Sequence, residues 1–251
     1  MTGKLWVVGL GPGAEDLQTS RAAVALATAS ELVGYGAYMD RVPPRAGQAR
    51  HPSDNRDELA RARHALSLAA AGRSVAVVSS GDAGVFAMAS TVLEAVETGD
   101  AEWRRLDIEV VPGISAMFAA AARIGAPLGH DFCAISLSDN LKPWDVVAQR
   151  LRAAASAGFV IALYNPLSRA RPWQLGAAFE LLRPLLPGST QIAFATAVSC
   201  PNEQIDITTL DEADPTRADM RTLVLIGSTA TRRIERPDAP PWLYSPRRCV
   251  A

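Results

Sequence analysis

The chain has 251 residues, of which 49% are hydrophobic and 20% charged, so it can bury the core of one large domain or two ordinary ones. Its 25 Lys and Arg residues nearly balance its 26 Asp and Glu residues, which argues against general binding to nucleic acid or to an anionic membrane. The three cysteines are odd in number and have no C-x-x-C spacing, which argues against a disulfide framework or a zinc site, and we expect no metal.

Short β-branched runs alternate along the chain with longer stretches of helical periodicity. Buried strands are predicted over 5–10, 74–79, 107–111, 159–164, 190–195 and 222–227. Helices are expected near 17–28, 54–71, 85–97, 115–124, 144–157 and 173–182. This alternation predicts an α/β fold with largely parallel strands.

The spacing of these elements changes near residue 112. Before it, strand and helix alternate with glycine at the strand ends. After it, the spacing loosens, and the runs 190–195 and 204–210 are expected to pair as antiparallel strands. We therefore predict two α/β domains, 1–112 with a mostly parallel sheet and 113–236 with a mixed sheet, and an active site in the cleft between them.

The remaining segments bear on location. No stretch reaches the roughly 20 apolar residues that span a bilayer, and the first apolar run is too short for a signal peptide. We therefore expect a cytoplasmic protein that does not enter a membrane. Residues 237–251 are rich in proline, which excludes a helix there, and we expect a surface tail.

Four predicted strands end in turns rich in glycine or proline. These turns read "GLGPGA" (9–14), "SSGDAGVF" (79–86), "VPGISA" (111–116) and "YNPLSRAR" (164–171). In an open α/β sheet the carboxyl ends of the strands line one edge, where ligands bind, so the four turns together indicate a ligand site. The first turn lacks the Lys of a P-loop, and Pro12 removes an N–H donor, so it suits a neutral or cationic ligand better than pyrophosphate.

These four turns resemble the signature turns of the tetrapyrrole methylases, which transfer a methyl group from S-adenosylmethionine. The resemblance runs from about residue 4 to residue 228. Within that family, "PLGHDFCAISLSDNLKPW" (127–144) is similar to members that act on precorrin-3B in cobalamin biosynthesis and couple methylation to contraction of the ring. The resemblance also implies a homodimer, for which apolar helix faces such as 116–126 offer a surface.

The resemblance assigns binding roles to residues of these stretches. The cofactor would be bound by Pro12, Gly81, Asp82, Val85, Ser115, Ala116, Asn165 and Ala197. Asp82 fits two roles equally well, a partner of the cofactor's amino or sulfonium group and a cap of the helix near Val85. Because a tetrapyrrole carries many carboxylates, Lys142, Arg169 and Arg171 are candidates for substrate binding, with solvated surface positions as the alternative.

Ring contraction needs proton transfer beside the macrocycle, which methyl transfer from a sulfonium hardly requires. The polar run over 130–139 offers His130, Asp131, Ser138 and Asp139 for this catalytic role. His130 fits equally well as a structural residue at the start of a strand, and Asp139 as a turn residue or helix N-cap. One departure from the family pattern is "ATAVSCPNEQ" (195–204), which lacks the usual basic residue but keeps Glu203.

Two other functions stay open from the sequence. A methylase of the same family could act on another precorrin, on uroporphyrinogen or on ribosomal RNA, although RNA requires a basic surface that the near-neutral charge does not favour. A regulatory module could bind S-adenosylmethionine without catalysis, but it would have no use for the polar run over 130–139.

Overall fold

The computed structural model describes residues 3–54, 57–168 and 172–248, and the chain divides into two compact units, Met1–Ala116 and Met117–Ala251. Each unit is an α/β domain with its own main sheet and its own hydrophobic core. The division falls a few residues after the predicted boundary, at the start of helix α5 (Ala116–Ile124).

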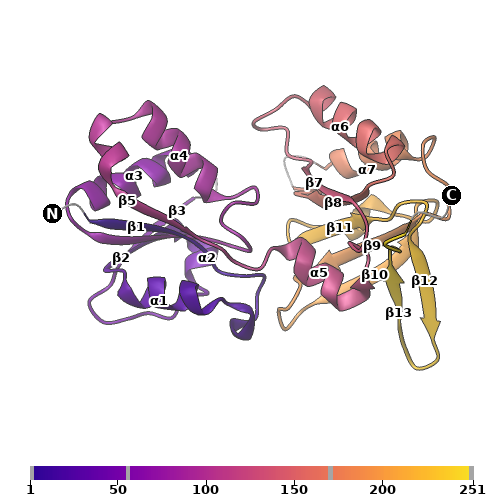
Figure 1. Cartoon of the computed structure of the whole chain (residues 1–251), viewed down its shortest axis with the longest axis horizontal. Helices are drawn as coiled ribbons and strands as arrows, with labels where there is room; N and C mark the ends of the chain where they lie inside the picture. Colours follow the sequence, from indigo (N-terminus) through magenta and orange to yellow (C-terminus); the bar gives the residue numbers. More distant parts are fainter. Residues whose placement is uncertain (1–2, 55–56, 169–171, 249–251) are drawn as a thin grey trace. The chain divides into compact units, whose positions relative to one another are not determined.

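The first unit is built on a sheet of five parallel strands (Figure 1). Its spatial order is β3 (Ala49–Ser53), β2 (Glu31–Tyr35), β4 (Ser74–Ser79), β1 (Lys4–Gly9) and β5 (Asp107–Val111). Helices α3 (Glu58–Ala70) and α4 (Met88–Thr98) cover one face and α1 (Ser20–Thr28) covers the other. The short elements of this unit are η1 (Glu15–Leu17), α2 (Gly36–Met39) and η2 (Ala101–Arg105).

Strand β1 shows why this sheet forms. Leu5 and Val7 pack in the core beneath α3 and α4, whereas Trp6 and Val8 pack in the core beneath α1. Because both faces are buried, the strand is a continuous apolar run rather than an alternating one, as is typical of parallel sheets.

The second unit is built on a mixed sheet of five strands. Its spatial order is β10 (Gln204–Thr209), β9 (Gln191–Thr196), β11 (Thr222–Ile226), β8 (Val160–Tyr164) and β7 (Phe132–Ser136). β7 and β8 are parallel, β11 is antiparallel to β8 and β9, and β10 is antiparallel to β9. Helices α6 (Trp144–Ser156) and α7 (Gln174–Leu182) pack on one face, around Leu151 and Phe179, and η3 (Pro215–Arg217) precedes β11.

A small third sheet takes up part of the predicted tail. It consists of β12 (Arg232–Arg236), β13 (Ala239–Tyr244) and β6 (Gly125–Ala126). The expectation of a tail was therefore wrong for 239–244, where Leu243 is buried and pairs with β6. Pro240 and Pro241 are accommodated because the pairing of β12 with β13 shifts register beside them, and such irregular positions tolerate residues without an N–H.

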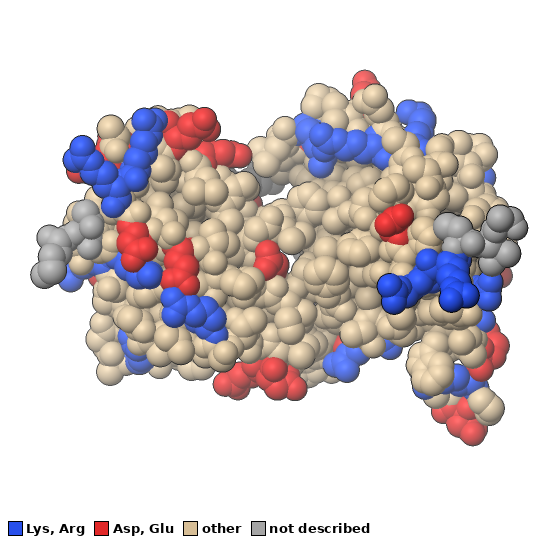
Figure 2. Space-filling view, in the orientation of Figure 1, with Lys and Arg blue, Asp and Glu red and all other residues tan. Residues whose placement is uncertain are grey.

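The predicted strands are confirmed as β1, β4, β5, β8, β9 and β11, and the predicted helices as α1, α3, α4, α5, α6 and α7. The antiparallel pairing of 190–195 with 204–210 is confirmed by β9 and β10. None of the helices in the described residues combines the length and the apolar character that a membrane span requires. On the face that Figure 2 shows, acidic and basic side chains form small separate groups, and most of the surface is uncharged.

Candidate functional site

Three of the four predicted turns meet at one edge of the first sheet. They follow β4, β1 and β5, which are neighbours in the sheet and run in the same direction. The turns after β1 and β4 are joined directly, because the N–H of Gly11 donates to the carbonyl of Gly81 at 3.0 Å and the N–H of Gly81 donates back at 2.9 Å. The fourth turn follows β8 in the second unit, so the expectation of four turns on one sheet edge was wrong.

Glycine is required where these turns approach one another. A Cβ on Gly113 would lie 2.2 Å from the carbonyl oxygen of Gly81, and one on Gly9 would lie 2.8 Å from the nitrogen of Gly113. A Cβ on Gly81 would make ordinary van der Waals contacts with its neighbours, but its φ of +66° is a conformation that side chains disfavour. The turns therefore meet through their backbone atoms, with no room for a side chain on Gly9 or Gly113.

The side chain of Asp82 links the turns after β4 and β5. Its Oδ1 accepts a hydrogen bond from the N–H of Gly84 at 2.8 Å, and its Oδ2 accepts one from the N–H of Gly113 at 3.0 Å. Helix α4 begins only at Met88, and the N–H of Met88 donates to the hydroxyl of Ser79 at 3.3 Å rather than to Asp82, so the capping role was wrong. The role of Asp82 toward a cofactor stays a prediction.

The other cofactor candidates of the first unit lie on the same edge. Pro12 and Val85 are half-buried in the turns after β1 and β4, and Ser115 is buried in the turn after β5. The backbone nitrogen of Ala116 is 3.7 Å from the Cβ position of Gly81. The structure thus brings the first-unit candidates together around the three turns.

Arg41 is a residue of this edge that sequence reasoning missed. It follows α2, and its guanidinium donates to the carbonyls of Leu10 and Gly11 and to the hydroxyl of Ser80. It also lines a cavity of about 250 Å³ beside the first turn, together with Gly13 and other residues. No sequence signal marks it, because its contacts join segments that are far apart in the chain.

The second unit presents its own set of candidates at one sheet edge. β7, β8 and β9 run in the same direction, since β8 and β9 are both antiparallel to β11. Asp139 and Lys142 follow β7, Asn165 follows β8 and Ala197 follows β9, so their backbones lie at the same edge. Asn165 and Ala197 both have positive φ, +52° and +49°, which non-glycine residues seldom adopt outside constrained sites.

The hydroxyl group of Ser136 joins the segments that follow β7 and β8 at this edge. The Oγ of Ser136, the last residue of β7, accepts from the Nδ2 of Asn165 at 2.9 Å and from the N–H of Ser138 at 3.3 Å. Helix α6 begins at Trp144 and its N-cap position is Pro143, so Asp139 does not occupy the N-cap position. Burial, together with the charge of Arg150, lowers the pKa of Lys142.

The four catalytic candidates do not form one cluster. His130 and Asp131 precede β7, whereas Ser138 and Asp139 follow it, and five strand residues span roughly 16 Å at about 3.3 Å each. The Nδ1 of His130 accepts a hydrogen bond from the N–H of Asp131 at 2.8 Å, which matches the alternative of a structural residue at the start of a strand. Arg169 and Arg171 lie outside the described residues.

The loop after β9 is held together by Glu203. Its Oε2 accepts from the N–H of Ser199 at 2.5 Å and from the Nε of Arg123 at 3.1 Å. Ser199, like Ala197, has positive φ. This loop has no basic residue of its own, but Arg123 on α5 contacts it through Glu203.

A family model, curated relatives and a solved structure all indicate the same protein family for this chain. The model of the tetrapyrrole (corrin/porphyrin) methylases matches residues 4–214. A relative from Sinorhizobium sp., named precorrin-3B C(17)-methyltransferase, is 58% identical over 98% of this chain and 97% of its own length. A relative from Salmonella typhimurium, named probable cobalt-factor III C(17)-methyltransferase, is 41% identical over 90% of this chain and 93% of its own. The crystal structure of the methyltransferase CobJ matches with a TM-score of 0.93 and 52% identity, covering 98% of this chain and 100% of that one.

Proposed function

The chain belongs to the tetrapyrrole methylase family, and we propose that it transfers a methyl group from S-adenosylmethionine to C17 of precorrin-3B and contracts the ring to give precorrin-4 in cobalamin biosynthesis. One observation carries the choice of substrate. The relative named precorrin-3B C(17)-methyltransferase is 58% identical, and the similarity extends over nearly the full length of both chains.

The three turns of the first unit fit such a cofactor. The N–H groups of Gly11 and Gly81 each donate to the carbonyl oxygen of the other residue, so they are not available to bind phosphate, and S-adenosylmethionine contains no phosphate. The close contacts around Gly113 mean that backbone atoms and the carboxylate of Asp82 form this part of the site, so a ligand can approach the backbone closely. When bound, S-adenosylmethionine supplies a methyl group that its positive sulfur has already activated.

The protein's own residues would then mainly bind, orient and exclude water, as a displacement on an activated methyl requires. We assign cofactor binding to Pro12, Gly81, Asp82, Val85, Ser115 and Ala116 of the first unit and to Asn165 and Ala197 of the second. The carboxylate of Asp82 has both oxygens engaged with N–H groups, so its main task is to hold the turns for the cofactor.

For the proton transfer of ring contraction we propose Asp139, with Ser138 beside it. Both follow β7 at the edge that also carries Asn165, whereas His130 and Asp131 lie at the other end of that strand. Lys142, in the same loop as Asp139, would pair with a carboxylate of the substrate. Arg169 and Arg171 stay candidates for the same role.

A second substrate is supported by a specific observation. The relative at 41% identity is named for cobalt-factor III, which makes this compound the main competitor of precorrin-3B. Turnover of the two compounds under identical conditions decides between them. We expect a higher kcat/KM for precorrin-3B, and a higher value for cobalt-factor III would reassign the substrate.

We also propose that the chain forms a homodimer and is located in the cytoplasm. Helix α5 supports the homodimer, because Phe118 on this helix is 49% exposed. Light scattering tests the assembly, and a species of 26.6 kDa alone would contradict it.

A further inference from the structure

Arg41 connects the two turns that follow β1 and β4. Its Nη2 donates to the carbonyl oxygen of Gly11 at 2.8 Å and to that of Leu10 at 3.3 Å, and its Nη1 donates to the Oγ of Ser80 at 3.0 Å. Leu10 and Gly11 belong to the first turn and Ser80 belongs to the second. One guanidinium group therefore contacts both turns at the same time.

The contact is made where the turns are already joined. The carbonyl oxygen of Gly11 accepts from Arg41 and also from the N–H of Gly81, so the side chain strengthens the same link that the backbone forms. A guanidinium presents five N–H donors in one plane, whereas an ammonium is a compact point charge. Lysine at this position cannot reach the three acceptors with the same geometry.

We propose that Arg41 is a positioning residue that fixes the turns at Gly11 and Gly81 in the conformation that binds the cofactor. The identity of the ligand rests on the proposed function, but the effect of Arg41 on the turns does not. Arg41 acts through the turns, because its guanidinium donates to atoms of Leu10, Gly11 and Ser80.

Hydrogen exchange of the protein without ligand tests the effect on the turns. In Arg41→Ala we expect the amides of Gly11 and Gly81 to exchange at least about tenfold faster. The reason is that the carbonyl groups of Leu10 and Gly11 lose the hydrogen bonds from the charged guanidinium. Arg45→Ala is the matched control. Arg45 lines the same cavity, but its Nη2 donates to the carbonyl of Ala29 at the end of α1, so its loss leaves exchange at the turns unchanged.

Calorimetry with S-adenosylmethionine tests the effect on binding. We expect Arg41→Ala to raise Kd by about tenfold to a hundredfold, in line with the loss of hydrogen bonds from a charged group, while Arg45→Ala leaves Kd within about twofold. The cavity beside Arg41 gives a small cation access to the emptied position. Guanidinium at millimolar concentration should therefore restore affinity to Arg41→Ala, whereas methylammonium at the same ionic strength should not.

Unchanged exchange at Gly11 and Gly81 together with an unchanged Kd would overturn the proposal. If the unaltered protein does not bind S-adenosylmethionine, the proposed function fails, and hydrogen exchange alone still decides the role of Arg41. If Arg41→Ala does not fold, Ser80→Ala removes only one of the three contacts. Ser80→Ala should then speed hydrogen exchange of the Gly81 amide more than that of the amides in the strands of the sheet. A Gly81 amide that exchanges at the wild-type rate in Ser80→Ala would count against the role of Arg41.

Discussion

Gly113 shows how a single residue sets the approach of the turns. Its Cβ position lies 2.2 Å from the carbonyl oxygen of Gly81, closer than any real side chain tolerates. We expect Gly113→Ala to push the turns apart, lower cofactor affinity at least about tenfold and cost roughly 1–3 kcal/mol of unfolding free energy, as overpacking does. Gly36→Ala, with nothing within 4 Å of its Cβ position, is the control. Calorimetry and denaturant titration measure both effects, and wild-type values in Gly113→Ala would contradict the site as described.

Substitutions of Asp139 and His130 test which end of β7 carries the proton-transfer group, because the two residues lie at opposite ends of that strand. We expect Asp139→Asn to reduce formation of the contracted product by about 10²–10⁴-fold, the usual contribution of a general acid or base, with cofactor affinity unchanged. His130→Ala should leave both quantities near their wild-type values. Single-turnover assays on the two variants measure this, and the reverse pattern would move the proton-transfer group to the other edge of the sheet.

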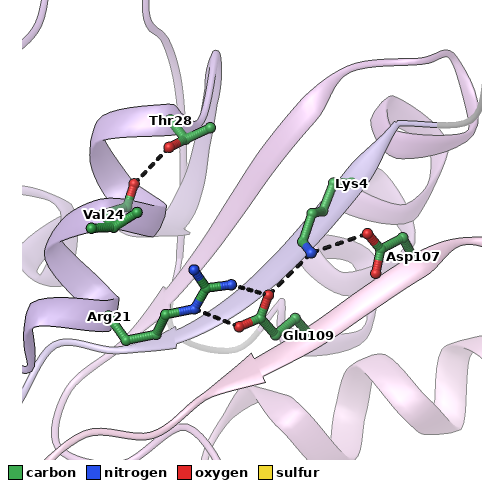
Figure 3. Close-up of polar contacts among 6 residues, drawn as sticks. All are labelled: Lys4, Arg21, Val24, Thr28, Asp107 and Glu109. Atoms are coloured by element: carbon green, nitrogen blue, oxygen red, sulfur yellow. Dashed lines mark hydrogen bonds and ion pairs between the residues drawn. The ribbon is translucent and has the colours of Figure 1, made fainter.

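At the scale of elements, four charged side chains join β1, β5 and α1 (Figure 3). The Nε and Nη2 of Arg21 on α1 donate to Glu109 on β5 at 2.7 and 2.5 Å. The Nζ of Lys4 on β1 lies 3.1 Å from Glu109 and 3.0 Å from Asp107. The hydrogen bonds from Arg21, and then that from Lys4, hold the pKa of Glu109 below its usual range.

This cluster predicts a dependence of stability on pH. Because the pKa of Glu109 is lower in the folded than in the unfolded chain, its stabilisation is present above the unfolded value of about 4.3 and is lost as pH falls through the folded value. The stability difference between the wild type and Glu109→Gln should thus be largest at neutral pH and shrink toward zero in acid. Denaturant titration from neutral to acid pH measures it, with Glu102→Gln, an exposed carboxylate outside the cluster, as control. A difference that is constant with pH would contradict the ion pairs.

The elements also show what a sequence can and cannot predict. β1 and β4 were predictable because both faces of each strand are buried and the apolar run is continuous. β3 was not, because "ARHPS" forms an edge strand that buries no residue fully, and β13 was hidden by its two prolines. The turns of the site could be found from their glycines. The link from Asp82 to Gly113, by contrast, depends on contacts between distant segments, which no local pattern encodes.

At the scale of the whole molecule, charge is consistent with a small-molecule substrate rather than RNA. The formal net charge is −1, and the face in Figure 2 carries no continuous basic area. RNA binding depends on many contacts between basic groups and phosphates, and it weakens steeply with salt. We expect methyl transfer to a tetrapyrrole to be nearly insensitive to a rise in salt that would abolish binding to ribosomal RNA, and a steep loss would favour the RNA substrate.

Methylation of C17 of precorrin-3B with contraction of its ring can be observed directly in the product. The most direct measurement is incubation of the purified protein with precorrin-3B and S-adenosylmethionine labelled with ¹³C in its methyl group, followed by NMR and mass spectrometry of the product. We expect one labelled methyl group, attached to C17 of a contracted macrocycle. A label on another carbon, or no transfer although calorimetry shows that the cofactor binds, would contradict it.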